Sequence, residues 1–257
     1  MVEQAAPSMR ALERGLAVLK SFTSTEGPVS ISELARRTGF DRAVIRRILG
    51  TLESLGYVTR RNGGFMLLPS VLELGYAYLS SDPLPGLVEP RLEPLAQKLQ
   101  ESCSFGVLEH NRVVYLVRAQ IKRISGPSLA VGSVMEPHLT SIGQTLLAHL
   151  DEHAVDAYLA EVPLEPITPR TITTPKALRQ RLARVRQQGW CLVDQELELG
   201  LLALAAPVRA SDGRIIGAVN ITSHTSRTTP DDFVEKMLPE LHETAAQIET
   251  DLRHAHM

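Results

Sequence analysis

The segment from Ser30 to Leu68 constrains the fold of this chain more than any other stretch. Ser30 precedes Glu33 by three residues, a spacing at which each side chain can bind a free backbone N–H at a helix start. Apolar residues then recur on one helical face, and Gly39 suits a turn in which φ is positive. The pattern predicts a short capped helix that ends in a tight turn.

A second helix is predicted directly after that turn. Asp41 can cap its start, and Gly56 can end it. Apolar side chains recur at three- and four-residue steps and predict a continuous buried stripe formed by Ile45, Ile48, Leu49, Leu52 and Leu55.

The opposite face of this second helix carries small residues and arginines. At about 100° per residue, Ala43, Arg46 and Arg47 share that face, with Arg42 beside them in the first turn. Arginine binds phosphates or the major-groove edge of guanine, and Ala43 could touch a thymine methyl group. The alternative is that these arginines only form a solvated face.

A glycine-tipped hairpin follows and favours the DNA interpretation. Tyr57–Arg61 and Phe65–Leu68 have strand patterns, and Asn62-Gly63-Gly64 suits a tight turn. A basic hairpin tip beside such a helix belongs next to a DNA backbone or minor groove. The segment therefore predicts a winged helix-turn-helix, and its candidate DNA-binding residues are Arg42, Ala43, Arg46, Arg47, Arg60, Arg61 and Asn62.

Charge and cysteine content fit this interpretation. Residues 1–68 contain ten Lys and Arg against six Asp and Glu, whereas residues 69–257 contain 17 against 23. The basic end is therefore the candidate nucleic-acid end. Only Cys103 and Cys191 are present, which suits a reducing cytoplasm and argues against a cysteine metal site. Since no apolar run approaches the roughly 20 residues that span a bilayer, we expect a cytoplasmic protein with no membrane partner.

The chain is predicted to have two domains joined by a helix. Ala11–Phe22 has the pattern of a first helix for the winged domain. The segment after the wing is apolar on more than one face and could pack against a partner, and Ser80–Gly86 contains two prolines and a glycine that disfavour a continuing helix. We expect a DNA-binding domain at 9–68, a linker helix and hinge at 69–86, and a second domain at 87–254.

Helix and strand patterns alternate in the second domain. Helices are predicted at Val88–Glu101, Ser141–Leu150, Glu152–Ala160, from Pro175 to Gly189 with Thr174 as cap, and from Thr229-Pro230 onward. Strands are predicted at Phe105–Glu109, Val113–Arg118, Cys191–Asp194, Leu202–Val208 and Ile215–Thr222, and Lys122–Gly132 is predicted to hold a flexible stretch and a strand.

Two motifs resemble the isocitrate lyase regulator (IclR) family of bacterial transcription factors. One is Ala11-Leu-Glu-Arg-Gly-Leu-Ala-Val-Leu, and the other is Gly189-Trp-Cys-Leu-Val-Asp-Gln-Glu-Leu-Glu-Leu-Gly200 followed by Ala205-Ala206-Pro207-Val208. The resemblance covers Met9 to Leu252, and the second motif is most similar to the branch that regulates protocatechuate and β-ketoadipate catabolism.

This resemblance implies an α+β fold: a winged helix-turn-helix, a linker helix, and a GAF-like effector-binding domain with an antiparallel sheet between helices. It also implies a ligand-responsive regulator that binds double-stranded operator DNA as a homodimer or dimer of dimers, without a cofactor. Paired recognition helices make physical sense because two half-sites multiply the specificity of one helix.

In this family a pocket of the second domain binds small organic acids, here expected to be aromatic or dicarboxylic. The matching positions are Met135, Ser141, Ile142, Asp194, Ala203, Asn220 and Thr222. Ser141 begins a predicted helix, whose free N–H groups favour an anion. The alternative is that Ser141 is only a helix cap and Asp194 a surface carboxylate. An acidic effector could be balanced by Arg118, Lys122, Arg123 or His138, and nothing local selects among them.

Two other functions deserve comparison with this one. His149-Leu-Asp-Glu152-His153 matches the H-x-x-E-H pattern of zinc peptidases, in which Glu152 would be the general base. However, Asp151 is a plausible cap between two helices, and a third ligand is not evident, so we expect no catalytic or metal-binding residues and no enzyme. An effector-independent DNA-binding protein is the other alternative, and the large acidic second domain argues against it.

Overall fold

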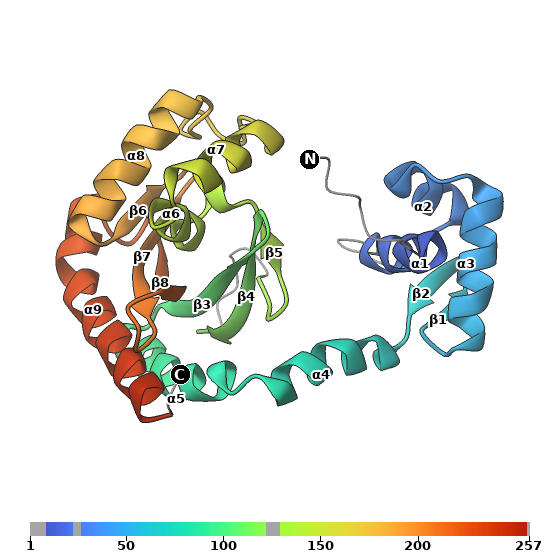
Figure 1. Cartoon of the computed structure of the whole chain (residues 1–257), viewed down its shortest axis with the longest axis horizontal. Coiled ribbons are helices and arrows are strands. Elements are labelled where there is room, and N and C mark those ends of the chain that lie inside the picture. The colour runs from blue at the N-terminus through green and yellow to red at the C-terminus, as the bar shows by residue number, and fades with distance from the viewer. Residues whose placement is uncertain (1–8, 23–26, 122–128, 256–257) are drawn as a thin grey trace, which may run out of the picture. The chain divides into compact units, whose positions relative to one another are not determined.

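The computed structural model describes residues 9–22, 27–121 and 129–255 (Figure 1). The chain divides into two units, Met1–Ser81 and Asp82–Met257. Within the described ranges, no helix combines the length and apolar character that a bilayer crossing requires.

The described residues of the first unit that precede Pro69 form three helices and a hairpin in the order predicted for a winged helix-turn-helix (Figure 1). Its elements are α1 (Arg10–Lys20), α2 (Ile31–Thr38), α3 (Arg42–Ser54), β1 (Val58–Arg61) and β2 (Gly64–Leu67). They enclose a core whose buried members include Val18, Leu34, Ile45, Leu49, Leu52, Val58 and Phe65.

Local capping explains α2 better than it explains α3. The Ser30 hydroxyl accepts a hydrogen bond from the Glu33 N–H at 3.2 Å, and Gly39 ends α2 with a φ of 70°. Asp41 occupies the N-cap position of α3, but its side chain makes no capping hydrogen bond, so the predicted cap is wrong in this respect. The predicted buried stripe also ends early, because α3 stops at Ser54 and leaves Leu55 62% exposed.

The wing closes with a two-residue turn rather than the predicted three-residue turn. Asn62 and Gly63 both have positive φ values, 46° and 79°, which is the geometry of a type I′ turn. Gly64 already belongs to β2 and pairs with Arg61. A Cβ atom on Gly64 would lie 2.9 Å from the Pro28 side chain, so this position requires glycine because the chain passes very close to it.

Two helices lie where the linker and hinge were predicted. After the 3-10 turn η1 (Pro69–Val71), α4 spans Leu72–Ser81 and α5 spans Leu84–Leu99. The predicted break at Ser80–Gly86 is therefore too long. Pro85 fits the first turn of α5, where a missing N–H costs nothing, and the Asp82 carboxylate accepts a hydrogen bond from the Leu84 N–H at 2.9 Å.

The second unit is built on one antiparallel sheet with the strand order β5-β4-β3-β8-β7-β6. The strands are β3 (Ser102–Glu109), β4 (Arg112–Ala119), β5 (Val134–Met135), β6 (Cys191–Asp194), β7 (Leu201–Arg209) and β8 (Ile215–His224). The predicted strand in Lys122–Gly132 does not form in residues 129–132, because β5 begins at Val134; residues 122–128 lie outside the described residues.

Helices cover both faces of this sheet, as the family fold implies (Figure 1). On one face, α5 and α9 (Pro230–His254) bury a cluster that includes Val88, Phe105, Leu204 and Phe233. The other face is covered by η2 (Pro137–Leu139), α6 (Ser141–Ala148), α7 (Glu152–Glu161) and α8 (Pro175–Gln188).

The start of α6 differs from the expectation that Ser141 caps it or leaves its N–H groups free. Thr140 is the N-cap residue, and its hydroxyl accepts a hydrogen bond from the Gly143 N–H at 3.0 Å. A Cβ atom on Gly143 would lie 2.3 Å from the Pro137 backbone, so a glycine is required where η2 approaches α6. The completely buried Ser141 side chain is therefore available for another role.

Candidate DNA-binding surface and effector site

The outer face of α3 presents the predicted recognition residues to solvent. Arg42, Ala43, Arg46 and Arg47 are all exposed, because Ile45 and Leu49 hold the opposite face of α3 in the core. Within the described part of the chain, none of these arginines has a carboxylate partner. Their guanidinium groups are therefore free to bind phosphates or base edges.

At the wing, one of the two arginines is held against the domain. The Arg60 guanidinium lies 5.2 Å from the centroid of the Phe65 ring and 3.4 Å from a Glu53 carboxylate oxygen. Arg61 and Asn62 are exposed beside it at the end of the hairpin. The geometry gives Arg60 a packing role and leaves Arg61 and Asn62 as the outward groups of the wing.

Four polar residues meet between the sheet and α6, and we call them the polar cluster. Strand pairing places Arg118 beside Ser104, and Ser104 beside Asn220, in one row across β4, β3 and β8. Arg118 Nη1 donates to Ser104 Oγ at 3.2 Å, and Asn220 Nδ2 donates to Ser141 Oγ at 3.4 Å. The polar cluster comprises Ser104, Arg118, Ser141 and Asn220.

Hydrogen bonding in the polar cluster is incomplete. Arg118 Nε is a buried donor without a partner, and Asn220 Oδ1 is a buried acceptor without one, although the Asn220 side chain is 98% buried. Burial lowers the pKa of Arg118, which has no carboxylate within ion-pair distance among the residues described. Each unmet buried polar group costs on the order of 1–3 kcal/mol, so the polar cluster has the properties of a site that a ligand completes.

Six of the seven residues predicted to bind an effector lie on this α6-facing side. Ser141 and Asn220 belong to the polar cluster, Ile142 and Met135 pack with the apolar residues beside it, and Ala203 pairs with Thr222 in the next row. The exception is Asp194, which pairs across strands with Leu202 of the opposite core and forms an ion pair with Arg170. The structure thus does not bring Asp194 to the others.

The structure also selects among the four cations that could balance an acid. Arg118 lies in the polar cluster, whereas Lys122 and Arg123 lie outside the described residues. His138 is buried with its Nδ1 atom 2.7 Å from the Tyr158 hydroxyl, and burial lowers its pKa from 6.5 to about 4, so its imidazole is neutral near pH 7. Sequence reasoning did not single out Ser104, although it is a polar residue within an apolar strand.

The zinc-peptidase pattern is divided between two helices. His149 follows α6, and its Nδ1 atom lies 2.8 Å from the Thr145 carbonyl oxygen. Glu152 and His153 begin α7, which Asp151 caps by accepting a hydrogen bond from the Ala154 N–H. In the portion of the chain that the structure describes, no three His, Cys, Asp or Glu residues are grouped to hold a metal ion.

A winged helix-turn-helix joined to this second unit defines the class of DNA-binding transcriptional regulators. The IclR helix-turn-helix domain matches residues 11–62, and the bacterial transcriptional regulator IclR C-terminal domain matches residues 76–250. The chain belongs to the IclR family. The predictions of a ligand-responsive regulator, and of a protein that is not an enzyme, are therefore confirmed.

Similar proteins narrow the branch of the family. The chain is 38% identical to the Pca regulon regulatory protein of Pseudomonas putida, over 90% of this chain and 80% of that protein. It is 34% identical to the p-hydroxybenzoate hydroxylase transcriptional activator of Acinetobacter baylyi, over 92% of this chain and 89% of that protein. An IclR homologue from Microbacterium hydrocarbonoxydans, crystallised with 4-hydroxybenzoate, superposes with a TM-score of 0.78 at 27% identity, covering 95% of this chain and 99% of the other.

Proposed function

We propose that this regulator controls the catabolism of aromatic acids through the β-ketoadipate pathway and responds to an aromatic carboxylic acid held at the polar cluster. The unpaired Arg118 Nε and the unpaired Asn220 Oδ1, both buried in one row of the sheet with Ser104 between their strands, are the observation that carries this proposal. Arg118 Nε is a donor that can bind an anionic acceptor, and Asn220 Oδ1 is an acceptor that can bind a donor. A ligand with a carboxylate and a hydroxyl group satisfies both atoms.

The carboxylate is assigned to Arg118 and Ser104, and the hydroxyl group to Asn220 and Ser141. Hydrogen bonds between a guanidinium group and a carboxylate are charge-assisted and contribute about 1.5–3 kcal/mol each. Thr145 lies one helical turn beyond Ser141, and its buried hydroxyl also lacks a partner. Met135 and Ile142 supply the apolar surface that an aromatic ring needs.

The names and ligands of relatives support this choice of effector. One relative is a p-hydroxybenzoate hydroxylase activator, two are named for the Pca regulon or operon, and one structural neighbour holds 4-hydroxybenzoate. An acid of that kind presents a carboxylate and a hydroxyl group on opposite sides of a ring, which is the pair of groups that the polar cluster lacks.

Operator DNA is assigned to α3 and the wing. The proposed contacts are Arg42, Ala43, Arg46, Arg47, Arg60, Arg61 and Asn62, with Arg60 contributing mainly by packing against Phe65 in the wing. Phosphate contacts by arginine make the affinity fall steeply with salt concentration. The regulator is proposed to act in the cytoplasm, where its operator lies.

A second copy of the chain is the proposed partner of the first unit. Leu12, Leu16 and Leu55 are 59%, 43% and 62% exposed around a groove of about 540 Å³ formed by α1, α3 and the start of α4. Leu72 and Tyr76 of α4 are also largely exposed. Exposed apolar surface of this extent favours burial against another chain, which supports the proposed homodimer or dimer of dimers.

Calorimetric titration with 4-hydroxybenzoate, protocatechuate and β-ketoadipate tests the effector. We expect an aromatic acid to bind the wild type and Arg118→Gln to weaken binding at least tenfold. Arg170→Gln is the matched control, because Arg170 pairs with Asp194 on the opposite face, and it should leave binding unchanged. If no acid binds or alters operator affinity, the proposal fails and an effector-independent DNA-binding protein becomes the better interpretation.

A further inference from the structure

One buried carboxyl group in the second unit has no part in the proposed ligand contacts. Glu196 is 2% exposed and lies between β6 and β7. Its Oε1 atom accepts a hydrogen bond from Arg181 Nη1 of α8 at 2.8 Å, and its Oε2 atom accepts one from Gln144 Nε2 of α6 at 2.7 Å. A buried ion pair is a weak source of net stability, so its presence calls for another reason.

Gln144 connects this ion pair to the effector site. It lies one helical turn after Ser141, and its side-chain amide also donates to the His138 carbonyl oxygen at 2.9 Å. The side-chain oxygen of Gln144, Oε1, accepts hydrogen bonds from Arg181 Nη1 at 3.2 Å and from the Cys191 thiol at 3.3 Å. Every polar atom of this amide is therefore engaged, which fixes the first turn of α6 in position.

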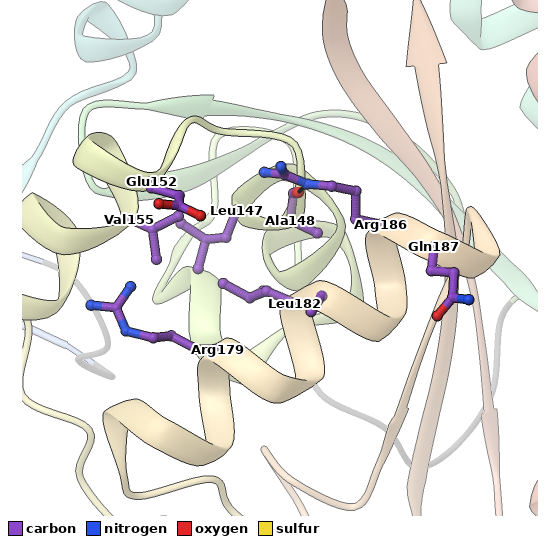
Figure 2. Close-up of a pocket in the computed structure, with 9 residues that line it drawn as sticks. Leu147, Ala148, Glu152, Val155, Arg179, Leu182, Arg186 and Gln187 are labelled. Atoms are coloured by element: carbon purple, nitrogen blue, oxygen red, sulfur yellow. Dashed lines mark hydrogen bonds between the residues drawn. The ribbon is translucent and has the colours of Figure 1, made fainter.

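A different arginine of α8 anchors the other end of α6. Figure 2 shows Arg186 extending from α8 toward Ala148, beside a pocket of about 420 Å³ lined by Leu147, Leu182 and Val155. Its guanidinium group donates to the carbonyl oxygens of Ala148 and Leu150. The same helix pair thus has one anchor at the effector end of α6 and another at the far end.

We propose that Glu196, Arg181 and Gln144 are positioning residues that hold the first turn of α6 against the sheet and thereby set effector affinity. The part of this inference that concerns effector affinity rests on the proposed function. Ser141 approaches Asn220 only across a 3.4 Å hydrogen bond, so a small displacement of α6 opens the polar cluster. Such an arrangement is the supporting layer that a precise binding site requires.

Replacement of Glu196 by glutamine tests the role of its charge with little change in shape. In Glu196→Gln, the dissociation constant of the aromatic acid should rise about tenfold, whereas operator affinity without effector should stay unchanged. Arg181→Lys should have a smaller effect of the same sign, because lysine keeps the positive charge but lacks the planar guanidinium group whose Nη1 atom meets the three acceptors. Arg186→Gln is the matched control and should leave effector affinity within twofold of wild type.

Hydrogen exchange in the ligand-free protein provides a readout that does not depend on the effector. Amides of Gly143 to Thr145 should exchange at least tenfold faster in Glu196→Gln, and amides near Ala148 should do so in Arg186→Gln. If the wild type binds no acid, the proposed function fails while this exchange pattern still decides the inference. Unchanged exchange at Gly143 to Thr145, or an equal loss of effector affinity in both variants, would overturn the positioning role.

Discussion

Helices α3 and α8 both carry arginines on one side and a buried apolar stripe on the other, yet they use their arginines differently. On α8, Arg181 binds the buried Glu196, Arg186 binds carbonyl oxygens at the end of α6, and Arg179 pairs with Asp156 of α7. On α3, Arg42, Arg46 and Arg47 have no ion-pair partner among the described residues. Arg179, Arg181 and Arg186 of α8 hold the fold together, and the arginines of α3 remain available to DNA.

The difference comes from the acceptors around each helix and not from the helix itself. Helix α8 is bordered by chain segments that offer carboxylates and unpaired carbonyl oxygens, while the outer face of α3 meets solvent. An exposed arginine with no partner gains most from a phosphate or a guanine edge, where its charge is not already neutralised. Substitutions on the two helices should therefore affect different measurements.

The largest change in the free energy of unfolding is expected when the buried ion pair between Arg181 and Glu196 is broken. Arg181→Ala leaves Glu196 as an uncompensated carboxylate, whose side chain is 3% exposed, and should lower the free energy of unfolding by about 3–5 kcal/mol. Arg179→Ala breaks an exposed pair on the same helix and should cost less than about 1 kcal/mol. Urea unfolding of both variants measures the contrast, and similar losses in the two would contradict it.

Protonation of His138 should make stability depend on pH. Burial lowers the pKa of folded His138 to about 4 from its ordinary value of 6.5. Between pH 6.5 and 4 the unfolded chain therefore takes up a proton at His138 that the folded chain does not. The contribution of neutral His138 to the free energy of unfolding is complete above pH 6.5 and is lost as the pH falls toward 4. Melting temperatures across this range should fall less steeply in His138→Gln than in wild type; parallel curves would count against the assignment.

Operator affinity should respond to the arginines of α3. Arg46→Ala should weaken operator binding by about 1–3 kcal/mol and leave effector affinity and unfolding unchanged. Arg184→Ala removes an exposed arginine from α8 and is the matched control, with no expected change in operator affinity. Fluorescence anisotropy with an operator duplex gives both values. Equal weakening by the two variants would show that only overall charge matters.

A smaller effect than these is expected from the loss of the helix cap at the start of α8. The Thr174 hydroxyl accepts a hydrogen bond from the Ala177 N–H at 3.3 Å, so Thr174→Ala should lower the free energy of unfolding by about 1 kcal/mol. Thr174→Ser keeps the acceptor and should restore most of that loss. A loss above about 2 kcal/mol would mean that Thr174 does more than cap the helix.

Signals in the local sequence were sufficient for most of the fold. Ser30, Thr174 and Asp151 cap helices as predicted, because capping depends on residues only three positions apart. Gly39 and Gly189 end helices with positive φ values of 70° and 82°. The outer face of α3 was also predictable, since helical periodicity alone separates its arginines from the core.

The effector site depended on information that is not local. A simple hairpin around His110-Asn111 would pair Ser104 with Val117, but a β-bulge between Phe105 and Gly106 shifts the register and brings Arg118 beside Ser104. Asp194 illustrates the same difficulty, because its side chain belongs to the opposite side of the sheet from Ala203. Strand parity and bulges are decided by tertiary pairing and leave little trace in the sequence.

In the proposed homodimer, the exposed apolar surface of α4 would link gene control to the amount of regulator in the cell. In the proposed homodimer, Leu72 and Tyr76 would be covered only when two chains meet, so the share of assembled protein rises with concentration. Because a palindromic operator favours paired recognition helices, the occupancy of the operator would rise more steeply than the concentration of the chain. A modest change in synthesis of this protein could then act as a signal alongside the metabolite.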